Sequence, residues 1–152
     1  MEQCFYILPD RNKWGWLAMS EQPTNWADVQ ANGAIAPDAA PYAALGLALE
    51  TMRSTLDGDG DSDAAIQTDL EAVRQAVAQL PEGVGLEQSL QVEIHKQLRL
   101  LEMDRAFLRT ARQAVTVAQR RSAMRDRIGV LLGYCTAGVA MRDASKPQDR
   151  QD

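Results

Sequence analysis

Hydrophobic residues recur every three or four positions in the middle of the chain, the spacing that places them on one face of an α-helix. One such series starts after Pro41, a residue favoured in the first turn of a helix. A second series follows Ser62 and Asp63, either of which can cap a helix, and stops at the sequence PEGVG. The first series is Tyr42, Leu45, Leu49, Met52 and Leu56, and the second is Ile66, Leu70, Val73, Val77 and Leu80. The sequence therefore predicts two helices of about 15 residues each.

The next run is much longer, because neither glycine nor proline interrupts the chain from Leu86 to Arg127. A single helix of about 40 residues would be roughly 60 Å long. Its hydrophobic residues form two neighbouring stripes that together cover about half of the circumference. The first stripe contains Leu90, Ile94, Leu98, Leu101, Leu108 and Val115, and the second contains Leu100, Met103, Phe107, Ala111, Ala114 and Ala118. We expect one long helix over residues 86–121 or more, packed by neighbours on two sides.

Two short helices can cover only part of so long a helix. Either the run bends back on itself, near Gln119–Ser122, or its exposed length pairs with a second copy of the chain. A seven-residue ladder at positions 94, 101, 108 and 115 favours pairing, although Arg105 and Arg112 interrupt the alternate positions. We expect a homodimer or another homo-oligomer that forms through the long helix.

A last helical stretch follows over about residues 128–143. Gly129, Gly133 and Ala137 recur in it at a spacing of four residues. Small residues at this spacing permit close contact between two helices.

The two ends of the chain differ from its helical middle. Residues 1–19 contain two runs rich in aromatic and aliphatic residues around the turn sequence PDRN, and they predict a small β-hairpin. Residues 20–40 predict a loop with a short helix, and residues 144–152 predict a disordered polar tail. The sequence thus predicts a mainly α protein with a single helical domain over residues 1–143. Its helices occupy residues 41–143 and form a bundle built around the long helix.

The composition is that of one globular domain. The chain has 152 residues, of which 45% are hydrophobic and 24% are charged, enough for one core. No signal sequence opens it, and its longest apolar stretch, residues 128–141, is too short to cross a bilayer. We expect a cytoplasmic protein with no membrane partner. Cys4 and Cys135 lie too far apart in sequence for a redox pair or a zinc knuckle, so buried thiols are expected.

The net charge of −5 conceals two regions of opposite sign. Residues 1–95 contain 15 acids and four bases, whereas residues 96–127 contain nine bases and three acids. Five arginines fall in one sector of the predicted long helix; this arginine ridge is Arg105, Arg109, Arg112, Arg120 and Arg127. It could bind the phosphates of a nucleic acid, or it could pair with carboxylates of residues 1–95 or of a partner protein. The acidic net charge favours carboxylates, and so does the lack of an aromatic residue within the sector that the arginines occupy.

Residues 57–63, DGDGDSD, place aspartates at alternate positions, as an EF-hand calcium loop does. However, Ser62 stands where that loop needs glycine, and Thr68 stands where it needs glutamate. The sequence therefore predicts a flexible acidic connector and no metal site. His95, the only histidine, has no second histidine or Glu-x-x-His pattern beside it, which indicates an ordinary surface residue.

No motif combines a nucleophile, a base and an oxyanion donor, and no nucleotide-binding fingerprint is visible. We therefore expect no enzymatic activity, no catalytic residue and no cofactor. The expected function is protein–protein interaction, as an adaptor, an assembly chaperone or a regulatory subunit. Trp14 and Trp16 join the arginine ridge as candidate partner-binding residues, because tryptophan is frequent in binding hot spots, although both could instead cap one end of the core. The alternative function is a nucleic-acid-binding regulator that uses the arginine ridge.

Overall fold

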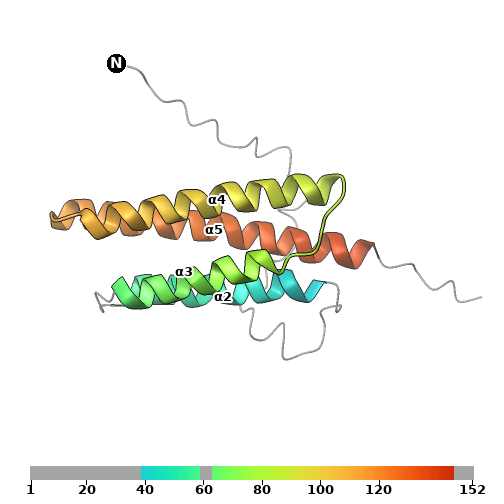
Figure 1. The fold of residues 1–152 in the computed structure, drawn as a ribbon, viewed down its shortest axis with the longest axis horizontal. Helices are drawn as coiled ribbons and strands as arrows, with labels where there is room; N and C mark the ends of the chain where they lie inside the picture. Colours follow the sequence, from blue (N-terminus) through green and yellow to red (C-terminus); the bar gives the residue numbers. More distant parts are fainter. Residues whose placement is uncertain (1–38, 59–62, 146–152) are drawn as a thin grey trace, which may run out of the picture.

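The computed structural model describes residues 39–58 and 63–145, which form an up-down-up-down bundle of helices without strands (Figure 1). The helices are α2 (Ala40–Asp57), α3 (Asp63–Ala78), α4 (Leu86–Thr110) and α5 (Ala114–Ala144). The prediction of a mainly α helical bundle is confirmed. Residues 1–38 and 146–152 lie outside the described residues. They include the predicted hairpin (1–19), nearly all of the predicted loop with a short helix (20–40) and most of the predicted tail (144–152). No helix in the described ranges is both long enough and apolar enough to cross a membrane.

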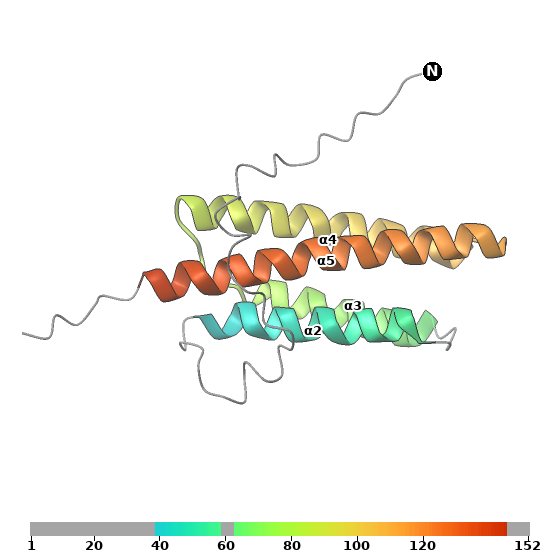
Figure 2. The same cartoon turned by 180° about the vertical axis from the view of Figure 1, so that it is seen from behind.

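Both shorter helices lie where the hydrophobic spacing predicts them. Pro41 stands in the first turn of α2, and α3 begins at Asp63. The connection from α3 to α4 contains Gly85, whose φ of 59° is a conformation that favours glycine over residues with a side chain. The two helices run antiparallel and side by side (Figure 2). Their fully or almost fully buried residues include Tyr42, Leu45, Leu49, Met52, Leu56, Ile66, Leu70, Val73 and Val77.

The prediction of one long helix over residues 86–121 is wrong, because the chain leaves the helix after Thr110 and turns back. Ala111 and Gln113 have extended backbone conformations, with ψ angles of 127° and 134°. The turn lies earlier in the chain than the expected bend at Gln119–Ser122. The helix expected over residues 128–143 is the second half of α5.

Burial of hydrophobic side chains explains why the chain turns at a place without glycine or proline. Folding back brings the first hydrophobic stripe of α4 into one core with α5. The buried residues are Leu90, Ile94, Leu98 and Leu101 on α4, and Met124, Ile128, Leu131 and Leu132 on α5. Each such side chain contributes about 1.5–3 kcal/mol, whereas ending one helix removes a few hydrogen bonds worth about 1 kcal/mol net each. The chain's own α5 therefore provides the cover that the sequence analysis expected from a second copy.

The second hydrophobic stripe of the predicted long helix is not packed on both sides. Met103 and Phe107 are 53% and 47% exposed on α4, while Leu100 is half-buried. The expectation of neighbours on two sides is therefore wrong for this part of α4. Its outer face remains partly apolar and open to solvent.

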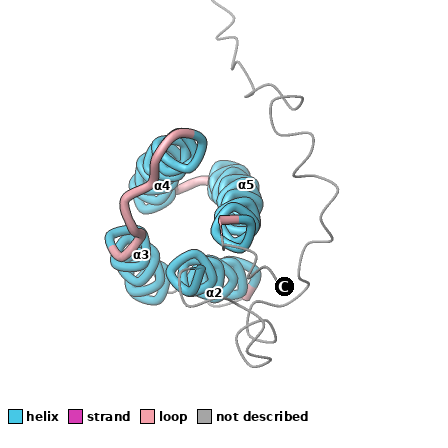
Figure 3. Tube along the Cα trace, turned by 90° about the vertical axis from the view of Figure 1, so that its right-hand side faces the viewer, coloured by secondary structure: helices cyan, strands magenta, loops and turns pink. Residues whose placement is uncertain are grey.

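The bundle consists of two helical hairpins, α2–α3 and α4–α5, which are joined mainly by close packing of α2 against α5. Seen end-on, the four helices form a ring in which α3 also neighbours α4 (Figure 3). α3 packs against α4 much less closely than the other neighbours pack. Two ion pairs span this looser side, Arg74–Glu102 at 2.7 Å and Arg105–Asp63 at 3.1 Å.

One glycine of α5 is required by a close approach to α2. A Cβ atom at Gly138 would lie 2.5 Å from Cε1 of the fully buried Tyr42 ring, which is far inside van der Waals contact. By contrast, a Cβ placed at Gly129 or Gly133 would have no described atom of another helix within 4 Å. The close helix contact expected along Gly129 and Gly133 is therefore absent from the described bundle, and Gly138 makes one instead.

We predict that Gly138→Ala lowers the free energy of unfolding by about 1–3 kcal/mol, because the new methyl group must displace the Tyr42 ring. Gly133→Ala is the matched control in the same helix. It should raise the free energy of unfolding by up to about 1 kcal/mol, because alanine favours the helix and has room there. Urea unfolding followed by circular dichroism measures both variants. Equal effects of the two substitutions would contradict the predicted contact.

Candidate functional site

The five arginines of the predicted ridge do not share one helix face, since the turn between α4 and α5 divides them. Arg105 and Arg109 belong to α4, Arg112 lies in the turn, and Arg120 and Arg127 belong to α5. The prediction of a continuous arginine ridge is therefore wrong. Trp14 and Trp16, the other candidate partner-binding residues, lie outside the described residues.

Three of these arginines pair with carboxylates of the same chain. Arg105 lies 3.1 Å from Asp63 at the start of α3. Arg120 lies 3.4 Å from Asp104, and Arg127 pairs with the other oxygen of that carboxylate. Pairing with a carboxylate of residues 1–95, one of the alternatives that the sequence left open, is thus found for Arg105 alone among the described pairs of these five arginines. Arg120 and Arg127 instead pair with Asp104 of the basic stretch (residues 96–127) itself.

Asp104 is the only charged residue that is buried in the described part of the chain, with 4% of its surface exposed. A buried carboxylate is costly unless it is paired and hydrogen-bonded. Arg120 and Arg127 are seven residues apart, about two turns of α5, so both can reach it from one face. The three residues consequently fix how α4 and α5 pair. The sequence contains a signal for this site, because Asp104 interrupts the apolar spacing between Leu101 and Leu108.

Both ends of the acidic connector are held by arginines of the other hairpin. Arg125 lies 2.6 Å from Asp57 and also donates a hydrogen bond to the carbonyl oxygen of Leu56 at 2.9 Å. At the other end of the connector, Asp63 forms an ion pair with Arg105 at 3.1 Å. The connector is thus anchored on both sides, and its residues 59–62 lie outside the described ranges. Within those ranges, no group of three or more His, Cys, Asp and Glu residues is arranged to hold a metal ion.

A second polar network lies at the opposite end of the bundle. Tyr42 donates a hydrogen bond to Oε1 of Glu87 at 2.8 Å, and Arg142 donates one to the same oxygen, also at 2.8 Å. Gln91 donates to the Tyr42 hydroxyl at 3.0 Å and to the carbonyl oxygen of Pro81 at 2.6 Å. The network ties α2, α4 and α5 to the loop before α4. The pKa of Tyr42 is raised from 10.0 to about 12, mainly because the hydroxyl is buried. The hydroxyl therefore keeps its proton and acts as a structural hydrogen-bond donor.

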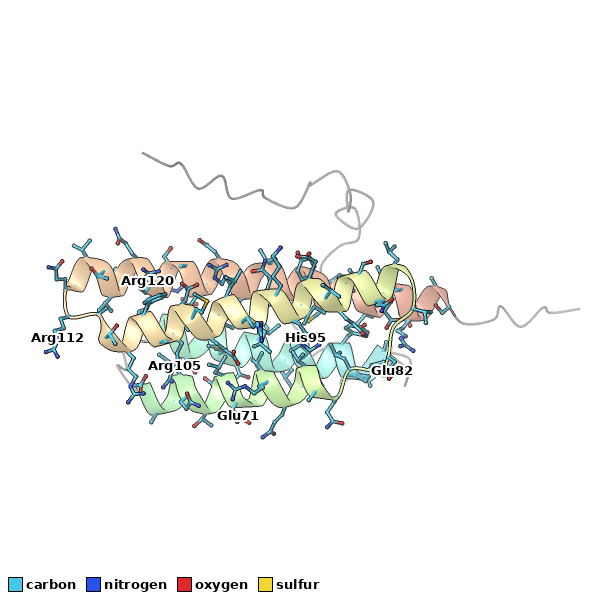
Figure 4. The ribbon with its side chains drawn as sticks, turned by 45° about the horizontal axis from the view of Figure 1, so that its top comes forward. Glu71, Glu82, His95, Arg105, Arg112 and Arg120 are labelled. Carbon is cyan, nitrogen blue, oxygen red and sulfur yellow. The ribbon has the colours of Figure 1, made fainter. Side chains whose placement is uncertain are left out.

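The other reactive side chains show no comparable assembly. His95 is exposed on α4, as predicted (Figure 4). Cys135 is fully buried, as expected, and burial raises the pKa of its thiol. A thiol that stays protonated is a poor nucleophile.

The turn between α4 and α5 extends beyond the ends of α2 and α3 (Figures 1 and 2). We call residues 105–123 the hairpin tip, because none of them is buried although many are apolar. Phe107 is 47% exposed and Val115 is 68% exposed, and Leu108 and Val117 are half-buried. The α5 part of the tip, ten residues from Ala114, is about 15 Å long.

The hairpin tip is also strongly basic. Residues 105–125 contain six arginines and no acidic residue. The other ten basic residues of the chain stand against 21 acids, so the remainder carries a net charge of −11. Arg109 and Arg112 are exposed and make no ion pair with any described residue, and Arg112 points away from the helices (Figure 4). The tip thus combines exposed apolar side chains with two arginines that no described carboxylate balances.

Phe107 is held within the tip by an arginine. The guanidinium carbon of Arg120 lies 4.7 Å from the centre of the Phe107 ring, at cation–π distance. Since Arg120 also binds Asp104, the buried carboxylate orients the arginine and the arginine orients the ring. No sequence spacing could reveal this chain of contacts, because it crosses the turn.

Comparison with protein-family models, with curated proteins and with solved structures finds no match to this chain. The geometry of the described residues therefore carries the functional argument.

We predict that Asp104→Asn lowers the free energy of unfolding by about 3 kcal/mol, because it leaves Arg120 and Arg127 without their buried carboxylate. Asp126→Asn is the matched control, since Asp126 is exposed on α5 and has no ion pair with a described residue. The control should change the free energy of unfolding by less than about 0.5 kcal/mol. Denaturant unfolding that finds both variants equally stable would refute the role given to Asp104.

We also predict that the wild type loses stability as the pH rises from 10 to 12 more steeply than Tyr42→Phe does. The unfolded chain releases the Tyr42 proton at its ordinary pKa of 10.0, whereas the folded chain keeps it up to about 12. Rising pH therefore favours unfolding of the wild type in this window. Unfolding free energies at pH 9, 10 and 11 test this, and parallel curves for the two proteins would contradict it.

Proposed function

We propose that this protein is a non-enzymatic protein–protein interaction module, acting as an adaptor, an assembly chaperone or a regulatory subunit, and that the hairpin tip is its contact surface. One observation carries the proposal. The hairpin tip begins where Arg105 pairs with Asp63 of α3, and from there it extends past α2 and α3 without a buried residue. It exposes Phe107 and Val115, and also Arg109 and Arg112, which make no ion pair with a described residue. Aromatic residues and arginine are enriched where proteins bind one another.

The length of the α4–α5 hairpin supports this proposal. α4 and α5 have 25 and 31 residues, whereas α2 and α3 have 18 and 16. In the added turns Leu108 is half-buried against the core, whereas Phe107 and Val115 stay exposed, so core packing does not account for the exposed apolar residues. A surface that gains cover only from a partner does account for them.

Self-association through a long helix, the mode that the sequence favoured, has lost its main support, because α5 covers the first stripe of α4. Charge also opposes contact between two tips. Each hairpin tip carries five arginines and no acidic residue, so pairing two tips would bring like charges together. The proposed partner is consequently a different protein.

Nucleic-acid binding, the alternative function, is less well supported by the same residues. Arg105, Arg120 and Arg127 already bind carboxylates. The rest of the chain, with its net charge of −11, would repel an extended polyanion. A phosphate backbone would also leave Phe107 and Val115 without an apolar partner.

The test compares a tip variant, Arg109→Glu/Arg112→Glu, with a control of the same charge change, Lys96→Glu/Arg99→Glu, which lies on α4 outside the tip. All four residues are exposed, so both variants should fold and unfold like the wild type. Proteins that co-purify with the wild type are identified, and each complex is rebuilt from purified components. The tip variant should bind the rebuilt partner at least about tenfold more weakly, a loss of roughly 1.4 kcal/mol.

Two results would overturn the proposal. One is a rebuilt complex that the tip variant and the control bind with equal affinity. The other is co-purification that nuclease treatment abolishes and that purified protein components fail to restore, which would point to nucleic acid.

A further inference from the structure

Resting on the proposed function, we propose that the hairpin tip binds a short acidic segment of another protein, with carboxylates against Arg109 and Arg112 and an apolar side chain against Phe107. The charge of the tip, its exposed apolar residues and its limited length lead to this partner chemistry.

The charge of the tip selects an acidic partner. Arg109 and Arg112 are exposed, three residues apart, and free of ion pairs with the described residues. A guanidinium group presents donors in a planar fork that matches a carboxylate. No acidic side chain occurs between Arg105 and Arg125. The carboxylates that pair with arginines of this stretch lie at the base of the tip, so no described carboxylate balances Arg109 and Arg112. Carboxylates that approach the tip are therefore attracted, and cationic segments are repelled.

The apolar residues of the tip require more than charge from the partner. Phe107 keeps 47% of its surface exposed, and Met103, one turn before it on α4, keeps 53%. These two side chains continue along one face of the helix, because they are four residues apart. A purely charged segment would leave Met103 and Phe107 exposed to solvent, whereas an apolar side chain of the partner would cover them. The partner segment is thus acidic with an apolar anchor.

The Phe107 anchor is already oriented before binding. Arg120 covers the ring at 4.7 Å and is itself tied to the buried carboxylate of Asp104 at 3.4 Å. Residues that are fixed before association lose less conformational entropy on binding. Asp104 is therefore a positioning residue for the surface, although it is itself buried.

The length of the tip limits the partner to a short segment. The tip extends about 15 Å along α5, which corresponds to about ten residues of a helix. Asp57 and Asp63 lie at its base, where they bind Arg125 and Arg105. A longer acidic chain that ran down the bundle would meet these carboxylates and the acidic remainder of the protein. The electrostatic attraction for an acidic segment is therefore confined to the hairpin tip.

A displayed library of random 12-residue peptides, selected on the full-length protein and counter-selected on Arg109→Glu/Arg112→Glu, tests the partner chemistry. The expected outcome is enrichment of peptides that combine several Asp or Glu residues with a large apolar residue. The best peptide is then measured by fluorescence anisotropy against four proteins: the wild type, the tip variant, Phe107→Ala and the control Lys96→Glu/Arg99→Glu. We expect affinity losses of at least tenfold for the tip variant and about fivefold for Phe107→Ala, with less than a twofold change for the control.

Further arms separate the alternatives. A labelled 12-base-pair duplex should bind more weakly than the selected peptide at the same salt concentration, and tighter, tip-dependent duplex binding would overturn the proposal in favour of nucleic acid. Enrichment of neutral or basic peptides, or no tip-dependent enrichment, would also overturn it. If the partner chemistry fails in this way while the rebuilt complex still depends on the tip, the proposed function survives. If neither depends on the tip, both proposals fail.

Discussion

The packing of α4 against α5 is the contact on which the rest of the structure depends. It buries Leu90, Ile94, Leu98 and Leu101 of α4, and it makes the chain turn at residues 111–113, where the sequence has no glycine or proline. The same packing leaves α4 and α5 longer than the hairpin beside them. The chain thus forms a bundle with one protruding end in place of the single long helix that the sequence predicted.

Ion pairs add to the packing of α2 against α5 that holds the two hairpins together. Two arginines of the basic stretch pair with the two ends of the acidic connector, Arg125 with Asp57 and Arg105 with Asp63. Most of these groups are exposed, and each such pair contributes at most about 1 kcal/mol. Asp104 differs because it is buried, and an unpaired carboxylate there would be strongly unfavourable. Its two arginines make the antiparallel pairing of α4 and α5 specific.

The protruding end concentrates the features that an isolated bundle does not need. Phe107 and Val115 stay exposed there, and Arg109 and Arg112 make no ion pair with a described residue. Both would gain from a partner that supplies acidic and apolar groups together. The ion pair between buried Asp104 and half-buried Arg120 links the two roles, because it stabilises the hairpin and also orients Phe107.

The sequence by itself determined the helical class, the places of α2 and α3, and the apolar face of α4, because these follow from spacing along a single helix. Only the tertiary structure decided the turn at residues 111–113, since that turn arises from burial between segments rather than from local breakers. The arginines show the same division. The number of arginines and their positive charge follow from the sequence. Whether Arg105 or Arg109 has a carboxylate partner depends on which residues the fold brings within a few ångströms.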